Sequence, residues 1–326
     1  MQQNNCLILL LFSTHFNTFT HRLKNPFNGF ATRWFMINLL LTFVFIVFVF
    51  VIGILPFRVL YFFSDIIYLV LYYIVGYRKS VVRDNIRKCF PDKSEEDIKH
   101  LIRLSYKNLS DVIVEGFKAF TMNDRQIKER HKVLNPEILN ELENNKRGII
   151  ATPCHYGNWE WGALSASLFF DMPTIVLYKP LSNPYVNKFV NKNRSRTKGR
   201  LVSIYESSKI FKEYADKRPF HIMAADQSPS NPKRAIWVNF LGRETAFLHG
   251  PELYAKKYNY PVIFVDIQRV KRGFYELYLS IISDNSVETK EKEITSKYAK
   301  KLEEAILKKP ENYLWSHKRW KLKKNN

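Results

Sequence analysis

The sequence predicts an α/β protein with a mixed central sheet flanked by helices, preceded by an N-terminal membrane-anchoring helical segment. An uncharged apolar run covers residues 34–57, and beyond Tyr77 short β-branched runs alternate with charged amphipathic stretches. Near the C-terminal end, two long strand-like runs are joined only by "KRG", which favours a hairpin and therefore a sheet that is not all parallel. With 326 residues, 46% of them hydrophobic, the chain has enough apolar material for a sizeable core.

The N-terminal region contains the segment that we expect to meet a membrane. Residues 1–33 show no periodicity, and Met36 opens the apolar run, so we expect these residues to be either a poorly ordered extension or a segment before the true start of the protein. The run "WFMINLLLTFVFIVFVFVIGILPF" (Trp34–Phe57) is long enough to cross a hydrocarbon layer of about 30 Å as a helix. The run "VLYFFSDIIYLVLYYIVGY" (Val59–Tyr77) carries an aspartate and many tyrosines, which indicates an interfacial helix or, alternatively, the second arm of a helical hairpin. We therefore assign residues 34–77 to the anchor and residues 78–326 to one large domain.

The elements of the large domain follow in order. Ser94 is placed to cap a helix of periodic apolar residues, and Asn135 opens another helix that ends near Gly148. A long charged helix over about Thr289–Lys308 stops at Pro310. The strand-like runs between these helices are Ile149–Thr152, Thr174–Tyr178, Leu201–Tyr205, Phe220–Ala225, Trp237–Leu241, Val262–Val270 and Phe274–Ile282.

The composition narrows the choice of partners. Lys and Arg number 51 against 30 Asp and Glu, so the formal net charge is +21 and the chain should seek anionic surfaces. Anionic lipid headgroups and acidic carrier proteins fit this charge, whereas the sequence contains no nucleic-acid-binding motif and we expect no nucleic acid partner. Cys6, Cys89 and Cys154 stand far apart without metal-ligand spacing, so we expect reduced thiols, a cytoplasmic setting and no metal site.

The stretch "ATPCHYGNWEW" (Ala151–Trp161) places an imidazole and a carboxylate five positions apart beside an apolar strand. If a helix begins near Asn158, His155 lies at the strand end and Glu160 in the first helical turn, where the helix dipole favours its charge. We expect Glu160 to accept the Nδ1 proton of His155 and to leave Nε2 free as a general base. The alternative is a packed histidine and a surface acid. A thiol nucleophile at Cys154 is disfavoured, because adjacent residues of an extended segment point to opposite faces.

A base beside a membrane anchor suggests chemistry on a hydroxyl group. A lipid or sugar hydroxyl must lose a proton as it attacks an acyl carbonyl, and a positioned base accelerates such a step by about 10²–10⁴-fold. The negative oxygen of the tetrahedral centre needs donors, which helix-start amides or an arginine can provide. The sequence therefore predicts acyl transfer.

Six blocks of the chain carry a family resemblance. They are "NIRKCFPDKSEEDIKHLI" (Asn85–Ile102), "HYGNWE" (His155–Glu160), "YKPLSNPYVNKFVNKNRSRTKG" (Tyr178–Gly199), "DQSPSN" (Asp226–Asn231), "FLGRETAFLHGPELYAKKYNYPVI" (Phe240–Ile263) and the terminal "NYLWSHKRWK". Together and in this order they resemble the bacterial lipid A biosynthesis acyltransferases, the lauroyl and myristoyl transferases of lipopolysaccharide biosynthesis. The resemblance covers most of the chain after the anchor. It implies a glycerolipid-acyltransferase-like fold and O-acyltransferase activity for residues 78–326.

The resemblance also assigns the reacting groups. It implies that His155 deprotonates the acceptor hydroxyl and that Glu160 tunes this histidine. It further implies that Arg194 holds the thioester oxyanion or a substrate phosphate. Arg196, two positions on, is the alternative for that role.

Further residues follow from the same resemblance as expected substrate-binding groups. Asp226 is expected to order the pocket, with Gln227 beside it, and Asn158 completes the expected set. His317 and Arg319 are expected either to meet phosphates at the membrane surface or to belong to a basic tail without a specific ligand.

The donor implied by the resemblance is an acyl chain held as a thioester on acyl carrier protein. The implied acceptor is a lipid A precursor, a phosphorylated and partly acylated glucosamine disaccharide, or a similar anionic lipid, and no metal or cofactor is implied. Both partners suit a basic protein. The implied location is the bacterial inner membrane, with the catalytic domain facing the cytoplasm. Two alternatives stay open: transfer to another lipid acceptor, such as an amino-acid lipid or a lysophospholipid, and a basic membrane-anchored binding protein without catalysis.

Overall fold

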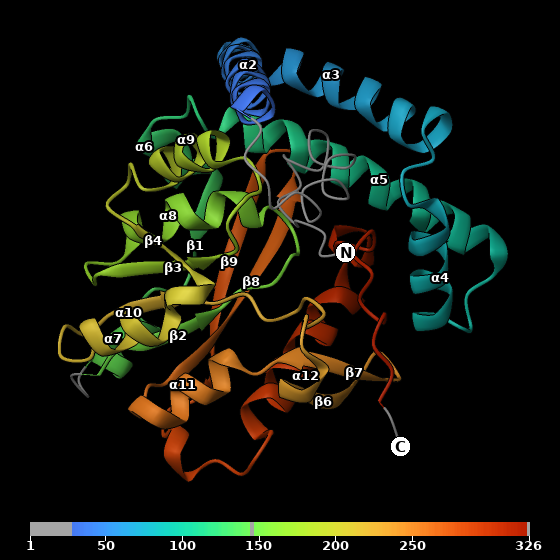
Figure 1. Ribbon diagram of the computed structural model, residues 1–326. Coiled ribbons are helices and arrows are strands. Elements are labelled where there is room, and N and C mark those ends of the chain that lie inside the picture. Colours follow the sequence, from blue (N-terminus) through green and yellow to red (C-terminus); the bar gives the residue numbers. More distant parts are fainter. Residues whose placement is uncertain (1–27, 144–146, 325–326) are drawn as a thin grey trace.

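The computed structural model describes residues 28–143 and 147–324, and in these residues a seven-stranded sheet forms the centre of the molecule (Figure 1). The strands of this sheet lie in the order β1-β9-β8-β2-β5-β3-β4, and β6 with β7 forms a separate two-stranded ribbon. The strands are β1 (His131–Val133), β2 (Ile149–Thr152), β3 (Thr174–Tyr178), β4 (Arg200–Ser203), β5 (Phe220–Ile222), β6 (Ala235–Phe240), β7 (Arg243–Leu248), β8 (Val262–Lys271) and β9 (Phe274–Ser283).

Helices surround the sheet and precede it in the chain. The α-helices are α2 (Asn28–Ile54), α3 (Phe57–Leu69), α4 (Lys79–Cys89), α5 (Glu95–Lys118), α6 (Asp124–Arg130), α7 (Ile138–Glu143), α8 (Gly162–Phe169), α9 (Pro184–Arg194), α10 (Ser207–Glu213), α11 (Gly250–Tyr258) and α12 (Glu293–Lys308). The shorter turns are the π-turn η1 (Val70–Ile74) and the 3₁₀ turns η2 (Trp159–Trp161), η3 (Ile204–Glu206), η4 (Pro232–Arg234), η5 (Ser286–Glu288) and η6 (Pro310–Asn312).

The sheet is mixed, as predicted. Strands β8 and β9 pair in an antiparallel hairpin, whereas β1 pairs parallel to β9, and β2, β5, β3 and β4 run parallel to β8. The hairpin turns at Gly273, whose φ of 76° lies in the left-handed region that favours glycine. Strands β2 and β3 have the predicted bounds, while β5 ends at Ile222, earlier than predicted. The short β1 and the charged β7 were not among the predicted strands.

Two hydrophobic clusters cover the two faces of the sheet. Along β2, Ile149 and Ala151 belong to one cluster and Ile150 to the other, because successive side chains of a strand point to opposite faces. Helices α6, α7 and α8 supply apolar residues to the first cluster. Helices α5, α10, α11 and α12 supply the second. The molecule is thus a layered α/β fold with helices on both faces of the sheet.

The predicted helices form, with shifted ends. Ser94 caps α5 as expected, since its side chain accepts a hydrogen bond from the backbone N–H of Asp97. The helix predicted from Asn135 is the shorter α7, and residues 144–146 near its predicted end lie outside the described residues. The helix predicted from Thr289 begins only at Glu293, where buried Glu252 accepts from the backbone N–H groups of Lys292 and Thr295.

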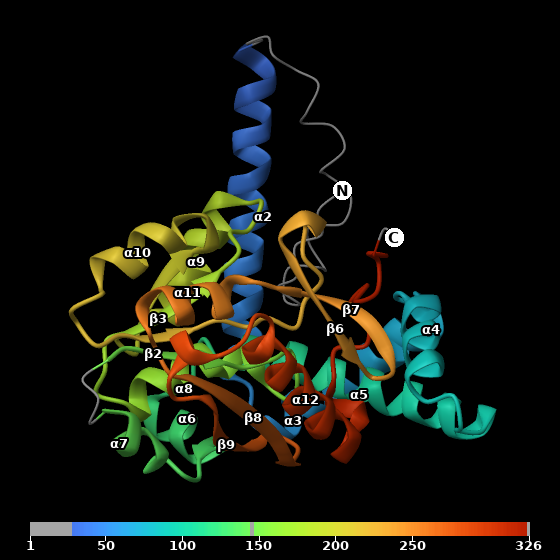
Figure 2. The same cartoon turned by 90° about the horizontal axis from the view of Figure 1, so that it is seen from below.

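The N-terminal helix α2 is apolar and projects beyond the rest of the described chain (Figure 2). Among the described residues, the stretches Phe35–Ile54 and Phe57–Ile74 are long and apolar enough to cross a membrane. The extension predicted over residues 1–33 lies outside the described residues up to residue 27. Residues 28–33 are helical, because α2 begins at Asn28, so the predicted boundary was too late.

Helix α3 lies along α5 and runs across the direction of α2 (Figure 1). The two helices are therefore not the antiparallel pair that a tight hairpin requires. Leu60, Ser64 and Tyr68 face the domain and are buried. The opposite face is apolar and exposed: Phe62 is 63% accessible to solvent and Ile66 is 40% accessible. An apolar outer face on a helix packed against a domain fits the interfacial helix predicted for this segment.

Candidate active site

The strand order brings together two segments that are distant in the sequence. Strands β2 and β5 are parallel neighbours in the sheet, with Ala151 opposite Ile222, so their carboxyl ends lie side by side. Ligand sites of α/β sheets form at such strand ends. His155 follows β2, and Asp226 with Gln227 follows β5. The position of this site is therefore a direct result of the sheet topology.

A sharp turn directs the chain away from His155. The backbone N–H of Tyr156 donates to the carbonyl of Cys154, and Gly157 has a φ of 59°. A Cβ atom at Gly157 would lie 2.5 Å from the carbonyl oxygen of Ile267, so only glycine fits this position. Asn158 then caps the η2 turn, because its Oδ1 accepts from the backbone N–H of Trp161. The expected turn and helix start near Asn158 are confirmed.

The imidazole of His155 is held by Asp226. Its Nδ1 lies 2.8 Å from Oδ1 of Asp226, and its backbone N–H donates to Oδ2 of the same carboxylate at 3.0 Å. The expectation that Glu160 accepts the Nδ1 proton is therefore wrong, because the neighbouring strand β5 supplies a closer carboxylate. Nε2 is not free either, since it lies 2.9 Å from the side-chain amide of Gln227. With the Nδ1 proton donated to Asp226, Nε2 carries the lone pair and accepts from this amide.

The charges of this pair stabilise each other. Burial by itself would lower the pKa of His155, but the Asp226 carboxylate outweighs burial and raises the pKa above its ordinary value. Burial by itself would raise the pKa of Asp226, but His155, its hydrogen bonds and the Arg319 guanidinium lower the pKa below the ordinary range. Asp226 is thus ionised at neutral pH and strengthens His155 as a base.

Glu160 forms a second pair in the same site. Its Oε2 accepts a hydrogen bond of 2.5 Å from Arg194 at the end of α9, and both side chains are largely buried. Both residues line the cavity described below. Arg196 points elsewhere, because its guanidinium donates to the carbonyl of Met122 and to Asn193. Of the two arginines considered from the sequence, Arg194 is the one that reaches the site.

The site opens into a cavity of about 730 Å³, a size common for ligand pockets. One part of its lining is polar and largely basic: His155, Glu160, Arg194, Gln227, Lys179, His317, Lys318 and Lys321. The other part is apolar and lies between the sheet and α8: Val133, Ala166, Phe170, Phe220, Val265, Leu277 and Leu279. A ligand with an anionic head and a long apolar tail matches this combination.

Two of the expected substrate-binding residues lie behind the cavity wall. Asn158 and Asp226 are buried and contact protein groups, Asn158 through the carboxylate of Glu115 and Asp226 through His155. Neither belongs to the lining of the cavity. Their contacts position other groups. Gln227, in contrast, lines the cavity beside His155.

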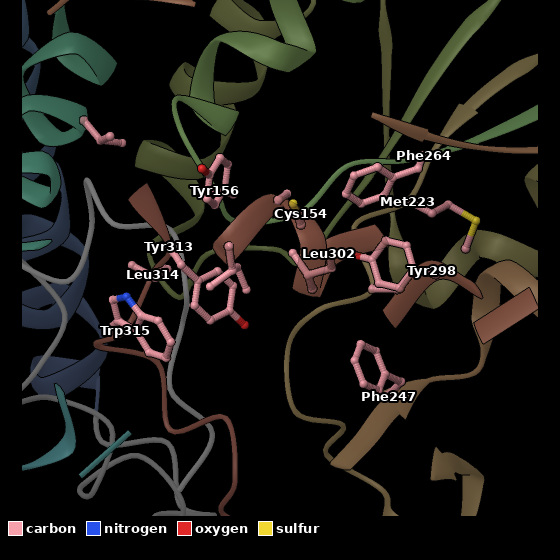
Figure 3. Close-up of a cluster of buried hydrophobic side chains, with 14 of the residues drawn as sticks. Cys154, Tyr156, Met223, Phe247, Phe264, Tyr298, Leu302, Tyr313, Leu314 and Trp315 are labelled. Atoms are coloured by element: carbon pink, nitrogen blue, oxygen red, sulfur yellow. The ribbon is translucent and has the colours of Figure 1, made fainter. Parts of the chain in front are cut away.

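The C-terminal segment packs against the turn that follows β2. The backbone N–H of Leu314 donates to the carbonyl of His155, and Tyr313 pairs with Tyr156 in an isolated β-bridge. Figure 3 shows Tyr156, Tyr313 and Leu314 in one cluster of buried hydrophobic side chains with Cys154. Burial raises the pKa of the Cys154 thiol well above its ordinary value, which disfavours a thiolate nucleophile.

Arg319 does not lie at the surface, where a phosphate could reach it. Arg319 is 1% accessible, donates to the carbonyl of Ala246 and lies over the ring of Phe247. His317 is also buried, and its Nε2 accepts from the backbone N–H of Ser228 next to the Gln227 segment. The expectation of phosphate contacts at the surface is therefore wrong for Arg319. Arg319 is buried because the C-terminal segment folds back against residues 155–161, which we call the catalytic turn.

Glu115 is the residue of the site that the sequence expectations left out. It is fully buried on α5 and accepts hydrogen bonds from Asn158, Tyr61 and Tyr275. One signal for it exists in the sequence: Asp111 and Glu115 lie four positions apart in an otherwise apolar stretch of an amphipathic helix. Two acids on the buried face of a helix indicate buried polar partners.

The arrangement at His155 is suited to removing a proton from a hydroxyl. A buried carboxylate fixes the tautomer, and the lone pair of Nε2 faces an amide that an entering hydroxyl can displace. Arg194 supplies a cation in the same cavity for a developing negative charge.

Known proteins resemble this chain in sequence. A family model described as bacterial lipid A biosynthesis acyltransferase matches residues 27–322. The lipid A biosynthesis lauroyltransferase of Escherichia coli K12 is 24% identical over 247 residues, which cover 75% of this chain and 79% of that protein. The palmitoleoyltransferase of the same organism is 23% identical over 270 residues, covering 82% and 86%. A lipid A biosynthesis acyltransferase of Haemophilus influenzae is 25% identical over 247 residues, covering 75% and 78%. The chain belongs to the bacterial lipid A biosynthesis acyltransferases, and it is a transferase enzyme of lipid A biosynthesis.

Proposed function

We propose that this chain moves a fatty acyl chain from the thioester of an acyl carrier protein to a hydroxyl of a lipid A precursor at the membrane surface. The observation that carries the proposal is His155, held by the buried carboxylate of Asp226, in the lining of a cavity that has a basic part and an apolar part. The apolar lining suits an acyl tail. The basic lining suits the phosphates of the acceptor or of the carrier's prosthetic arm.

In the proposed reaction, Nε2 of His155 takes the proton of the acceptor hydroxyl as its oxygen attacks the thioester carbonyl. Asp226 holds the ring and stabilises the imidazolium that forms. The tetrahedral intermediate then collapses: the carbon–sulfur bond breaks, the imidazolium returns its proton to the carrier thiolate, and the ester remains on the acceptor. No redox step or added cofactor is needed.

Arg194, held by Glu160, can stabilise the negative charge that develops in this reaction. Glu160 fixes the guanidinium of Arg194 by a hydrogen bond of 2.5 Å. A guanidinium held in this way faces the cavity and can stabilise the oxyanion of the tetrahedral intermediate or a substrate phosphate. Lys179, Lys318 and Lys321 add positive charge at the same lining.

The membrane-bound mode rests on α2 and α3. The apolar helix α2 is long enough to span, and α3 presents an apolar outer face beside the catalytic domain. We place the catalytic domain on the cytoplasmic side of the bacterial inner membrane, where acyl carrier protein is found and the acidic carrier meets a basic chain.

Lipid mass spectrometry of a deletion strain tests the proposed function. The strain is complemented with the wild type, with His155→Ala or with Glu160→Ala, and its lipid A is compared. We expect lipid A to lack one acyl chain in the deletion and to regain it only with the wild type. Complete acylation with the His155→Ala variant contradicts the mechanism. Loss of a chain from another lipid, with lipid A unchanged, contradicts the acceptor and favours an amino-acid lipid or a lysophospholipid.

A further inference from the structure

The carboxylate of Glu115 is the meeting point of three parts of the chain. Its Oε1 accepts from the hydroxyl of Tyr61 on α3 at 2.8 Å. Its Oε2 accepts from the side-chain amide of Asn158 and from the hydroxyl of Tyr275 on β9, both at 2.7 Å. The indole N–H of Trp161 donates to the backbone carbonyl of Glu115 at 2.9 Å. The membrane-facing helix, the catalytic turn and the sheet are thus joined at one residue.

Asp111, one turn earlier on α5, strengthens the connection to α3. Its carboxylate accepts from Ser64 on α3 at 2.6 Å and pairs with Arg269 and Arg272 of the β8–β9 hairpin. Arg272 also pairs with Asp65 on α3. The inner face of α3 thus carries the hydrogen-bonded hydroxyls of Tyr61 and Ser64 beside buried Leu60, while the exposed face is mostly apolar.

Glu115 and Asp111 differ in their partners. Asp111 contacts two guanidinium groups, whereas the hydrogen-bond donors around Glu115 are neutral. Burial, followed by the charge of Asp111, raises the pKa of Glu115 to about 7, against the opposing effects of Tyr275, Arg269 and Tyr61. A carboxylate buried at this cost depends on the full set of its donors. The geometry around Glu115 is accordingly sensitive to the position of each donor.

We propose that Glu115 is a positioning residue that couples the seating of α3 on a membrane to the alignment of the catalytic turn, through Tyr61 on one side and Asn158 on the other. Asn158 lies between His155 and Glu160 and caps the turn that carries Glu160. A shift of α3 moves the Tyr61 hydroxyl, and the Glu115 carboxylate carries the shift to Asn158. The inference rests on the proposed function, because its kinetic readout is acyl transfer.

Removal of the Tyr61 hydroxyl is the first test. The full chain is reconstituted in vesicles of phosphatidylethanolamine and phosphatidylglycerol and assayed with an acyl-carrier-protein thioester and a lipid A precursor. A misplacement of about 1 Å at a reacting group costs up to about 100-fold in rate, so we expect Tyr61→Phe to lower kcat by about 10–100-fold. KM should stay within about twofold, because the substrate contacts remain. An unchanged kcat in Tyr61→Phe overturns the proposal.

Tyr106→Phe is the matched control. Tyr106 on α5 is buried and donates its hydroxyl to the carbonyl of Tyr77, so this variant also removes a hydroxyl between α5 and the N-terminal helices. It has no part in the Glu115 contacts. We expect its kcat to stay within about twofold of the wild type. A loss equal to that of Tyr61→Phe shows general loosening of the interface and overturns the specific route through Glu115.

Comparison of Glu115→Gln with Glu115→Ala distinguishes a role of Glu115 in hydrogen bonding from a role of its negative charge. The glutamine has the same shape: its oxygen can accept from Asn158 and Tyr275, and its amide can donate to the Tyr61 oxygen. We expect Glu115→Gln to keep kcat within about threefold and Glu115→Ala to lose about 10–100-fold. Equal losses in both variants overturn positioning by hydrogen bonds. If the alanine variant does not fold, the kcat values of Glu115→Gln and Tyr61→Phe, each compared with the wild type, still test the proposal.

Hydrogen–deuterium exchange gives a readout that does not depend on activity. We expect vesicles, compared with detergent, to slow amide exchange over residues 156–162 in the wild type and not in Tyr61→Phe. If the wild type shows this response but transfers no acyl chain, the proposed function fails and the coupling stands. If the wild type transfers acyl chains and Tyr61→Phe matches it in both readouts, the coupling fails and the proposed function stands.

Discussion

Asp226→Asn tests the assignment of the residue that orients His155. In the wild type, the two oxygens of Asp226 face two donors, the Nδ1–H and the backbone N–H of the same histidine. The asparagine side chain has one oxygen and one NH₂ group, so one of these donors must face another donor. If the NH₂ group faces Nδ1, the imidazole proton moves to Nε2, and the ring can no longer act as a base toward the cavity.

The expected loss of kcat follows from the contribution of a general base to the rate. Positioned base catalysis contributes about 10²–10⁴-fold, which corresponds to about 3–5 kcal/mol of activation free energy. We therefore expect kcat of Asp226→Asn to fall by about 10²–10⁴-fold. The pH profile should also move. Burial lowers the pKa of His155 and Asp226 raises it, so without Asp226 burial is opposed only by the smaller effect of Glu160 and the pKa of His155 falls. Because the base must be unprotonated, the acid limb of kcat/KM shifts to lower pH.

Initial rates of acyl transfer measured across pH for three proteins check this reasoning. The wild type, Asp226→Asn and Glu160→Gln are compared in the same vesicles. Glu160 also raises the pKa of His155, but it is the smallest of the contributions that do so. We expect the acid limb to move further in Asp226→Asn than in Glu160→Gln. The opposite order would refute Asp226 as the residue that orients the base and would restore Glu160 to that role.

Four further substitutions test the other assignments in and around the cavity. Arg194→Gln should lower kcat by about 10²–10³-fold, as the loss of an oxyanion donor does. The kcat of Arg196→Gln should stay within about threefold of the wild type. Steady-state assays compare the two variants, and similar losses in both would contradict the choice of Arg194. Cys154→Ser should retain transfer within about tenfold because the thiol is buried and protonated, and complete inactivity of a folded variant would speak for a thiol mechanism. Ala166→Leu fills part of the apolar lining and should favour shorter acyl chains in the product, measured by mass spectrometry; unchanged chain lengths would place the acyl tail elsewhere.

Local patterns in the sequence were sufficient for much of the fold. The bounds of β2 and β3, the Ser94 cap and the β8–β9 hairpin all depend on neighbouring residues, and all were predicted. Strand β1 was missed because three residues are too few to show an alternating pattern. Strand β7 was missed because it begins with charged residues and pairs only with β6 in a separate ribbon.

The partner of His155 depended on long-range order. A carboxylate five positions along the chain was the nearest candidate in the sequence, but Gly157 turns the backbone and sends Glu160 to Arg194 on α9. Asp226 reaches the imidazole only because β5 inserts between β2 and β3 in the sheet. No spacing within the "HYGNWE" block carries that information. The Glu115 contacts were missed for the same reason, since their donors come from three distant segments.

The inner face of α3 has a practical consequence for shortening the chain. A start at residue 78 is the natural choice for removing both apolar segments and obtaining a form that needs no detergent. That cut would leave the carboxylates of Asp111 and Glu115 without the hydroxyls of Ser64 and Tyr61 and would open a charged interior to water. Helix α3 has the composition of a membrane segment, but it also covers buried carboxylates of the catalytic domain. A shortened form should retain it from Phe57 onward.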